Sequence, residues 1–361
     1  MGSCALSSKK RKTIYEQSPK INKSCFNMKY AIGRGGFGKV WKVEYKRDNN
    51  IYAMKILSKA RIIGKNCVKS IMNERKILEI LDCPFLVNLK FAFQDHHNCY
   101  LVTDLMSGGD LRYAFIQKKT FTEDQAKFII GAILIGLDYI HDYNIIHNDI
   151  KPENIVFDNE GYPRITDFGI SICSTNNWDS KILPGCDARC IGTLGYMAPE
   201  KIFNTGYSRM VDFYALGVIL YEFILGRKPY KCKDRKELKE KMKNDPAFIS
   251  KSEHPDTWSS DARNFANRLL DKSETDRIGS EGIEEILTHP WFDDLDWDKL
   301  ENRELTPPYI PETESDNFHS HNVNKTDRWM NENKTVLEKS KQMLRHPTVQ
   351  DLFKDYGYFP C

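Results

Sequence analysis

Two short segments near the middle of the chain carry the residues best suited to chemistry. Residues 146–154 read IHNDIKPEN, and residues 167–169 read DFG. Carboxylate and amide oxygens can hold magnesium beside a phosphate, while a separate carboxylate accepts the proton of an attacking hydroxyl. We therefore predict that Asp149 is a catalytic base and that Asn154 and Asp167 are magnesium ligands.

A glycine-rich segment could bind the phosphates of a nucleotide. Residues 33–40 read GRGGFGKV, which fits the pattern G-x-G-x-x-G-x-V. Glycines let the backbone approach a phosphate and point its N–H groups at the anion. The same pattern also suits a plain hairpin turn or a dinucleotide loop, but a dinucleotide loop opens a helix, and the residues that follow here look like a strand. We expect nucleotide contacts from Gly33, Gly35, Gly36, Phe37, Gly38 and Val40.

A lysine and a glutamate could orient those phosphates. Lys55 ends the short apolar stretch Tyr52-Ala53-Met54, and Glu74 lies on one face of a predicted helix over residues 68–81. Paired, they would hold the lysine against the α- and β-phosphates. Taken singly, a lysine at the end of an apolar strand is more often a solvated strand end, and Glu74 could equally be a surface charge of the helix.

Composition bounds the class of protein. The chain has 361 residues, 40% of them hydrophobic, and its net charge of +3 is too small to indicate a nucleic-acid partner. Ten cysteines without regular spacing suggest free thiols in a reducing compartment, so we expect a cytoplasmic protein. Cys173, Cys186 and Cys190 leave a metal site as a weaker alternative, because the tight CxxC pairs of zinc sites are missing.

The elements that must position these residues fall into two parts and a tail. Residues 1–27 are polar and basic and are expected to be disordered. Strand patterns follow at 29–45, 50–57 and 99–105. Thr122, with Gln125 at the capping-box position, predicts a helix that runs to about His141. Further helical patterns cover 209–225, 235–243, 259–270, 282–288 and 325–345.

The ordered set of motifs resembles the eukaryotic protein kinase family over roughly residues 28–292. This likeness implies an α+β, bilobal protein kinase fold: a small β-rich N-lobe with one main helix, about residues 28–104, and a larger α-helical C-lobe, about residues 105–292. Residues 293–361 would form a C-terminal tail. The implied reaction transfers the γ-phosphoryl group of ATP, with Mg²⁺, to a hydroxyl of a protein substrate.

The catalytic residues favour an active serine/threonine kinase over a pseudokinase. By resemblance, Lys151 would contact the γ-phosphate, and it is typical of kinases that act on Ser or Thr rather than Tyr. A pseudokinase would use the same fold as a nucleotide-binding scaffold or allosteric partner. Such proteins normally lack at least one of Lys55, Asp149, Asn154 and Asp167, and this chain has all four.

Within the family the chain is similar to the AGC group and, more narrowly, to the YANK subgroup. The stretches IMNERKIL, CPFLVNLKFAFQD and LMSGGDLRYAF carry this likeness. It implies an adenine-binding hinge at residues 104–106 that includes Asp104 and Met106, with Thr103 as gatekeeper and Ala53 in the nucleotide pocket. Asp110 would contact the ribose or a basic substrate residue.

Three carboxylates could set the substrate preference. Asp110, Glu153 and Glu222 match acidic positions with which AGC kinases read arginines that precede the target hydroxyl. The alternative is that these carboxylates belong to the scaffold or face solvent.

The tail carries two further likenesses to AGC kinases. Asn317-Phe318 resembles a tail element that lies beside the nucleotide, and residues 353–358, FKDYGY, resemble the terminal hydrophobic motif. That motif would dock its aromatics on the small lobe beside the Glu74 helix. Gly357 replaces its usual phosphorylatable Ser or Thr. The alternative is a disordered terminus with incidental aromatics.

The chain departs from the family at a regulatory position. Asn148 replaces an arginine that normally grips a phosphate on the activation loop, and Arg189 replaces the usual phosphoacceptor. We therefore expect activity without phosphorylation of this loop, with Ser174, Thr175 and Ser180 as alternative acceptors. After the loop, Ala198-Pro199-Glu200 closes the segment, and Arg277 is the expected buried partner of Glu200.

The N-terminal segment could anchor the chain to a membrane. Gly2 and Cys4 suit acylation, and Lys9-Lys10-Arg11-Lys12 forms a basic run. Against this, the myristoylation pattern prefers Ser or Thr at position 6, which is Leu6 here, so a solvated tail is the alternative. We expect a monomer.

Overall fold

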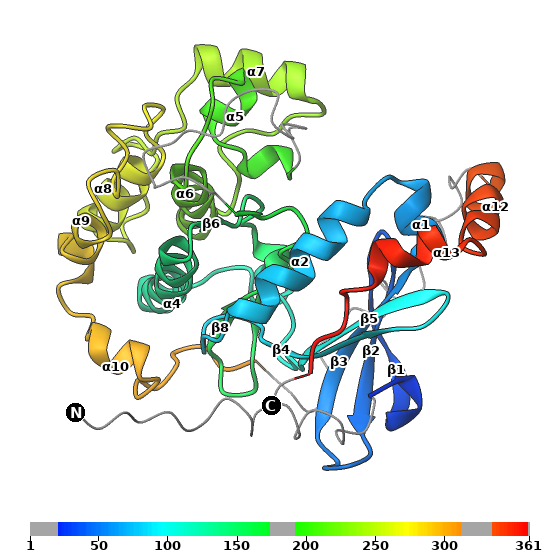
Figure 1. The fold of residues 1–361 in the computed structure, drawn as a ribbon. Coiled ribbons are helices and arrows are strands. Elements are labelled where there is room, and N and C mark those ends of the chain that lie inside the picture. The colour runs from blue at the N-terminus through cyan, green and yellow to red at the C-terminus, as the bar shows by residue number, and fades with distance from the viewer. Residues whose placement is uncertain (1–20, 174–191, 312–333, 360–361) are drawn as a thin grey trace, which may run out of the picture.

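Two lobes make up the molecule in the computed structural model, which describes residues 21–173, 192–311 and 334–359 (Figure 1). The small lobe is an antiparallel sheet in the order β1-β2-β3-β5-β4. Its strands are β1 (Phe26–Arg34), β2 (Gly38–Tyr45), β3 (Ile51–Ser58), β4 (Leu89–Gln94) and β5 (Asn98–Asp104). Two helices follow β3 in this lobe, α1 (Lys59–Gly64) and α2 (Val68–Ile80).

The large lobe is helical and confirms the expected α+β, bilobal architecture. Its helices are α3 (Leu111–Lys118), α4 (Glu123–Asp142), α5 (Pro199–Phe203), α6 (Met210–Leu225), α7 (Arg235–Asn244), α8 (Ser260–Leu269), α9 (Glu284–Leu287) and α10 (Trp297–Glu301). Short strands β6 (Ile145–Ile146), β7 (Ile155–Phe157), β8 (Pro163–Ile165) and β9 (Ile172–Cys173) lie where this lobe faces the sheet. The catalytic segments are the loops between these short strands.

Local sequence signals explain the two long helices of this lobe. Thr122 and Gln125 form the predicted capping box at the start of α4, with Oγ1 of Thr122 accepting the N–H of Gln125 at 3.3 Å. Helix α6 is buried along nearly its whole length and ends at Gly226, whose φ of 65° favours glycine. A helix that is apolar all round occupies the centre of a lobe, so α6 supports the catalytic loop from within.

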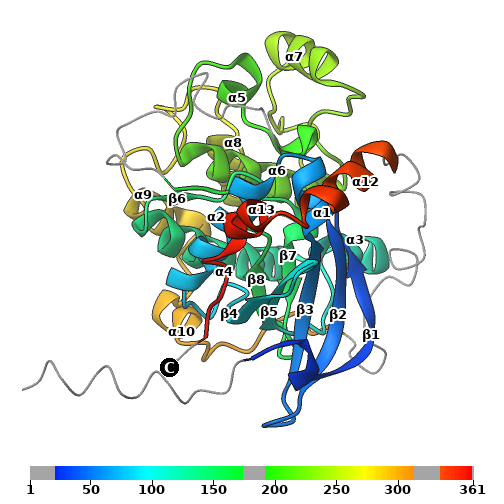
Figure 2. The ribbon, with the colours of Figure 1, turned by 45° about the vertical axis from the view of Figure 1, so that its right-hand side comes forward.

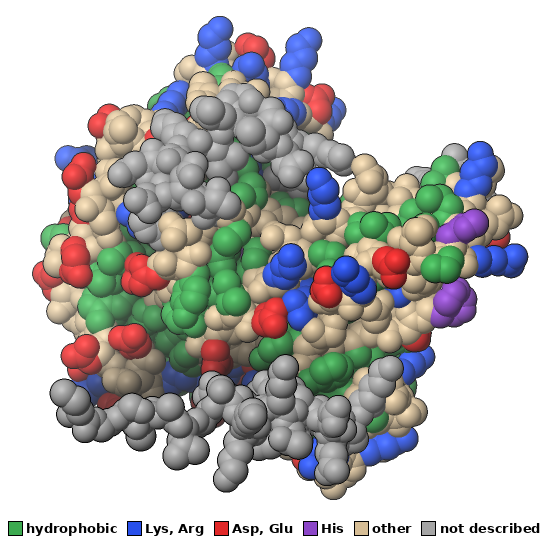
Figure 3. Space-filling view, in the orientation of Figure 1, with side chains coloured by type: hydrophobic (Ala, Val, Ile, Leu, Met, Phe, Trp, Pro, Cys, Tyr) green, Lys and Arg blue, Asp and Glu red, His purple; other side chains and the backbone are tan. Residues whose placement is uncertain are grey.

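Several short elements were not predicted from the sequence, among them β4 and the helices α1 and α3. Helix α1 has six residues and α3 has eight, too few for a periodic pattern to stand out. Among the residues that the structure describes, no helix is long and apolar enough to cross a membrane. Figure 3 shows charged side chains of both signs interspersed on one face, with hydrophobic side chains gathered over the large lobe.

The C-terminal tail docks on the small lobe. Helix α12 (Lys334–Met343) packs against α1, and the short turn Asp351–Phe353 that follows α13 (Pro347–Gln350) contacts α2 (Figures 1 and 2). Phe353 and Tyr356 are fully buried. Tyr358 forms an antiparallel bridge with Ala92 of β4, with N–H to O distances of 2.8 and 2.9 Å. The expected docking of the hydrophobic motif is therefore present, and the alternative of a disordered terminus is wrong for residues 334–359.

Several predictions fall on residues outside the described ranges. They concern acylation at Gly2 and Cys4, the loop residues 174–191, the alternative metal site with Cys186 and Cys190, and the tail element Asn317-Phe318. These stay predictions.

Candidate active site

The lysine of β3 and the glutamate of α2 form the predicted pair. Lys55 Nζ lies 2.7 Å from Glu74 Oε1 and 3.4 Å from Asp167 Oδ1. Burial would lower the pKa of Lys55, but the two carboxylates outweigh it and hold that pKa above its usual value. The charge of Lys55, together with its hydrogen bond, lowers the pKa of Asp167 despite burial. Helix α2 is therefore docked with a charged lysine at the site.

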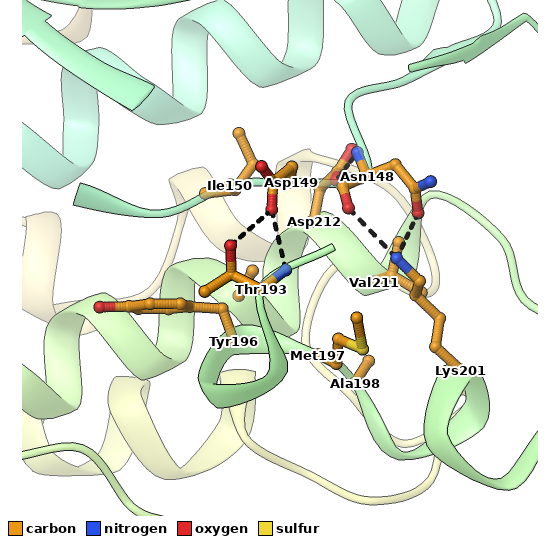
Figure 4. A pocket seen from close by; sticks show the side chains of 11 residues that line it. Asn148, Asp149, Ile150, Thr193, Tyr196, Met197, Ala198, Lys201, Val211 and Asp212 are labelled. Carbon is orange, nitrogen blue, oxygen red and sulfur yellow. Dashed lines mark hydrogen bonds between the residues drawn. The ribbon is translucent and has the colours of Figure 1, made fainter. Parts of the chain in front are cut away.

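Three residues, two from the catalytic loop and one from the end of the activation segment, surround the carboxylate of Asp149. Thr193 donates to Asp149 Oδ1 from its backbone N–H at 3.0 Å and from its hydroxyl at 3.1 Å. Lys151 donates to Asp149 Oδ2 and, at 2.9 Å, to Thr193 Oγ1. Asn154 Nδ2 donates to the Asp149 carbonyl at 2.9 Å. Figure 4 shows Asp149 directed at Thr193, so the end of the activation segment lies against the predicted base.

Asp212, a carboxylate that the sequence analysis missed, holds the backbone of the catalytic loop. Asp212 of α6 accepts the backbone N–H of His147 at 2.9 Å and that of Asn148 at 2.8 Å. Burial by itself would raise the pKa of Asp212, but hydrogen bonds and charge, chiefly from His141, bring it below its usual value. The available signal was a charged residue within a mostly apolar helix, since a buried charge needs partners.

His147 ties the catalytic loop to the segment that carries Asp167. Its Nε2 lies 3.1 Å from the Thr166 carbonyl, and its Nδ1 lies 3.4 Å from the Asp149 amide nitrogen. Both contacts are satisfied by a neutral ring with the proton on Nε2. Burial lowers the pKa of His147, which favours that neutral form.

Asn148 is held by a lysine rather than by a phosphate. Lys201 Nζ lies 2.6 Å from Asn148 Oδ1, and Asn148 Nδ2 donates to the Ile170 carbonyl at 3.2 Å. The backbone of Asn148 has φ 73°, a left-handed conformation that asparagine tolerates better than most residues. The Lys201 contact is drawn in Figure 4. Lys201 was not singled out from the sequence because its partner lies far away along the chain.

The predicted nucleotide-binding segment forms a tight turn between β1 and β2. Gly35 N donates to Gly38 O at 2.9 Å within the β1–β2 turn. A Cβ at Gly38 would lie 1.6 Å from the Ile56 carbonyl oxygen, so only glycine fits there. A Cβ at Gly35 would meet nothing within 4 Å. Packing therefore does not require glycine at position 35, whereas the predicted close approach of a phosphate would.

The remaining nucleotide residues lie along two paired strands and the connection that follows them. Ala53 of β3 is paired with Thr103 of β5. Asp104 ends β5, and Met106 follows on the way to α3. Asp110 is the N-cap of α3, since its Oδ1 accepts the Tyr113 N–H at 2.7 Å. Asp110 thus has a helix-capping role whatever else it contacts.

Glu200 and Arg277 form the expected buried pair. Arg277 Nη1 lies 2.7 Å from Glu200 Oε1, and Nη2 lies 3.1 Å from Oε2. Arg277 is fully buried, so this bidentate pair fixes the end of the activation segment on the large lobe.

The donor set at Asp167 and Asn154 fits a magnesium ion completed by phosphates. Asn154 uses its amide nitrogen on Asp149, which leaves its oxygen for a metal. Half of the Asp167 side chain is exposed. No group of three His, Cys, Asp or Glu side chains able to hold a metal occurs among residues 21–173, 192–311 and 334–359. A protein usually supplies few of the ligands of Mg²⁺, and phosphate and water supply the rest.

Comparison with known proteins agrees with this geometry. The family model described as the protein kinase domain matches residues 26–292. The chain belongs to the protein kinase family. Protein kinases generally use ATP and Mg²⁺, which the Asp167 and Asn154 donor set fits.

Individual relatives extend the match beyond the family model. A probable serine/threonine-protein kinase of Dictyostelium discoideum is 38% identical over 302 residues, covering 83% of this chain and 63% of its own length. Serine/threonine-protein kinase sgk-1 of Caenorhabditis elegans is 39% identical over 292 residues, covering 80% and 61%. Serine/threonine-protein kinase gad8 of Schizosaccharomyces pombe is 36% identical over 299 residues, covering 83% and 51%.

The chain thus spans between half and two-thirds of the length of these relatives. Relatives such as sgk-1 and gad8 are of the AGC type, which confirms the resemblance at that level. The finer likeness to the YANK subgroup stays a prediction.

Proposed function

We propose that the protein is a serine/threonine protein kinase that transfers the γ-phosphoryl group of ATP to a protein hydroxyl. The observation that carries this proposal is that both predicted clusters are formed: Asp149 with Lys151 and Thr193, and Lys55 with Glu74 and Asp167. A pseudokinase would not need a base, Asp149, assembled together with the two cations Lys151 and Lys55. It would also not need the ion pair between Lys55 and Glu74 that is formed here. The serine/threonine class is supported by Lys151 and by the names of the relatives.

The residues divide the work of transfer between them. Asp149 orients the acceptor hydroxyl and takes its proton as the oxygen forms a bond to the γ-phosphorus. The bond from that phosphorus to the bridging oxygen breaks, and its electron pair leaves with ADP. Lys151 and Lys55 are the fixed cations beside the negative charge, where preorganised charge lowers the barrier most. When bound at Asp167 and Asn154, magnesium would neutralise phosphate charge.

An arrayed peptide assay tests this proposal. Purified protein with MgATP is offered matched peptides that differ only in the acceptor, which is Ser, Thr or Tyr. We expect transfer to Ser or Thr peptides and little to Tyr. ATP binding without transfer to any peptide would support the pseudokinase alternative instead.

We also propose that activity does not require phosphorylation of the activation segment. The Lys201–Asn148 contact supports this, because it ties the end of that segment to the catalytic loop without a phosphate. Protein made in bacteria, with its phosphosites mapped by mass spectrometry, should be active before and after phosphatase treatment. Activity that appears only when Ser174, Thr175 or Ser180 is phosphorylated would refute the proposal.

A further inference from the structure

An internal arginine fills the acidic pair that would otherwise read a substrate arginine. Arg112, on the first turn of α3, points its guanidinium between Glu153 and Glu222. Its Nε lies 3.1 Å from Glu153 Oε1, while Nη1 and Nη2 lie 3.1 and 3.0 Å from the two Glu222 oxygens. The contact with Glu222 is bidentate, which is the strong geometry of an arginine–carboxylate pair.

A tyrosine completes the enclosure of Glu222. The hydroxyl of Tyr196 donates to Glu222 Oε2 and also contacts Arg112 Nη2. Both Glu222 oxygens are therefore occupied, and only 8% of the Glu222 side chain is exposed. Burial raises the pKa of Tyr196, so its hydroxyl keeps its proton and remains a donor.

The same tyrosine connects this cluster to the acceptor site. Tyr196 lines the pocket that also contains Asp149 and Thr193, as Figure 4 shows. Glu153 follows Asp149 by one short turn of the catalytic loop. A peptide whose hydroxyl reaches Asp149 must therefore pass close to Arg112.

Packing holds Arg112 in place. Its Cζ lies 5.5 Å from the centre of the Phe115 ring, one helical turn further along α3. One quarter of the Arg112 side chain is exposed. A substrate arginine would have to displace four polar contacts and this stacking to reach Glu222, and would gain the same contacts in return.

The charge of this cluster also disfavours the binding of a substrate arginine. Two carboxylates would present two negative charges to the peptide, and Arg112 removes one of them. The charge that remains is on Glu153, which is 42% exposed and therefore screened by solvent. Lys228 adds a second cation, with Nζ 4.3 Å from the Tyr196 ring centre.

We propose that Arg112 is a specificity-determining residue that closes the Glu153–Glu222 pair, so that this kinase does not select an arginine before the acceptor hydroxyl. This rests on the proposed function for the identity of the ligand, which is a peptide bearing the acceptor. Under this proposal Glu153 and Glu222 have the scaffold role that the sequence analysis gave as the alternative to substrate recognition.

Peptide binding tests this without requiring catalysis. The probe is a peptide whose acceptor is alanine and whose preceding residues are replaced one at a time by arginine. Wild-type protein should bind arginine and alanine versions alike. The variant Arg112→Gln keeps a polar side chain next to Glu222. It should bind one of the arginine peptides more tightly than the matching alanine peptide, on the order of tenfold, as expected for a charge-assisted pair. Arg112→Ala should behave likewise if it folds.

A second arginine variant is the control for this experiment. Arg268→Ala removes an exposed arginine of α8 that pairs with Glu285 of α9, and it should leave the binding ratios unchanged. Tenfold selection of arginine by the wild type, or no detectable selection by folded Arg112→Gln, would overturn the inference. An absence of phosphoryl transfer would refute the proposed function and would not alter this comparison.

Discussion

The Nζ atom of Lys201 lies 2.6 Å from Oδ1 of Asn148, and both residues are buried. The same Nζ lies 3.1 Å from the Asn148 carbonyl oxygen. Lys201 belongs to α5, just after the activation segment, whereas Asn148 precedes the predicted base in the catalytic loop. A neutral amide next to a buried lysine thus replaces the arginine and phosphate expected from the family.

Removing this lysine should weaken the catalytic loop. Lys201→Met keeps the volume but leaves Asn148 Oδ1 buried without its donor, at a cost of about 1–3 kcal/mol. We expect a lower free energy of unfolding in urea and a lower kcat. Lys236→Met, at an exposed position on α7, is the control and should change neither quantity. An unchanged kcat in Lys201→Met would show that the contact is incidental.

The docked tail should support the Lys55–Glu74 pair through α2. Arg75 of α2 donates to the Gly357 carbonyl, and Lys59 Nζ lies 4.9 Å from the centre of the Phe353 ring. Phe353→Ala removes a fully buried ring, a type of change that costs on the order of 3–5 kcal/mol in a protein core.

We expect the Phe353→Ala variant to lose activity and to show faster amide hydrogen exchange in α2. The matched control is Leu352→Ala, because Leu352 is 51% exposed. Equal exchange rates and equal activity in the two variants would mean that the tail does not support α2.

The buried Glu200–Arg277 pair should be strongly sensitive to loss of one partner. Arg277→Met leaves Glu200 buried without its counter-ion, which costs on the order of 3–5 kcal/mol. Arg227→Met breaks the exposed pair with Glu253 and should cost about 0–1 kcal/mol. Urea unfolding of both variants checks the contrast, and similar losses in the two would contradict the structural role of the buried pair.

Protonation of His147 should lower the free energy of unfolding as the pH falls. Burial lowers its pKa in the folded state, and the carboxylates of Asp212 and Asp149 only partly offset this. The unfolded chain, in which a histidine has a pKa of about 6.5, therefore binds the extra proton first as the pH falls. Stability from this group is complete above that value and is lost as the pH falls below it.

We expect the free energy of unfolding to fall as the pH drops below about 6.5, with His147 contributing up to ~1.4 kcal/mol per pH unit. His147→Phe keeps a ring next to Phe168 and should flatten this slope. The exposed His96→Gln variant should retain it. An identical slope in wild type and His147→Phe would show that His147 does not titrate in this window.

The sequence predicted contacts that belong to short motifs better than contacts that join distant segments. Lys55–Glu74 and Glu200–Arg277 were expected because each residue has a fixed place in a motif. Arg112 was not singled out, because neither charge nor spacing shows which remote carboxylate a surface-helix arginine will meet. Asp212 and Glu222 could have been recognised together, since both are charged residues in the apolar helix over 210–225 and both needed partners.

The central claim is that Asp149 serves as the base for phosphoryl transfer to a Ser or Thr hydroxyl. The most direct measurement compares wild type with Asp149→Asn for transfer from MgATP to the same serine peptide, with ATP affinity measured in parallel. We predict measurable transfer by the wild type and a loss of roughly 10²–10⁴-fold in the variant, with ATP affinity retained. Equal transfer by the two proteins, or none by the wild type despite ATP binding, would contradict the account.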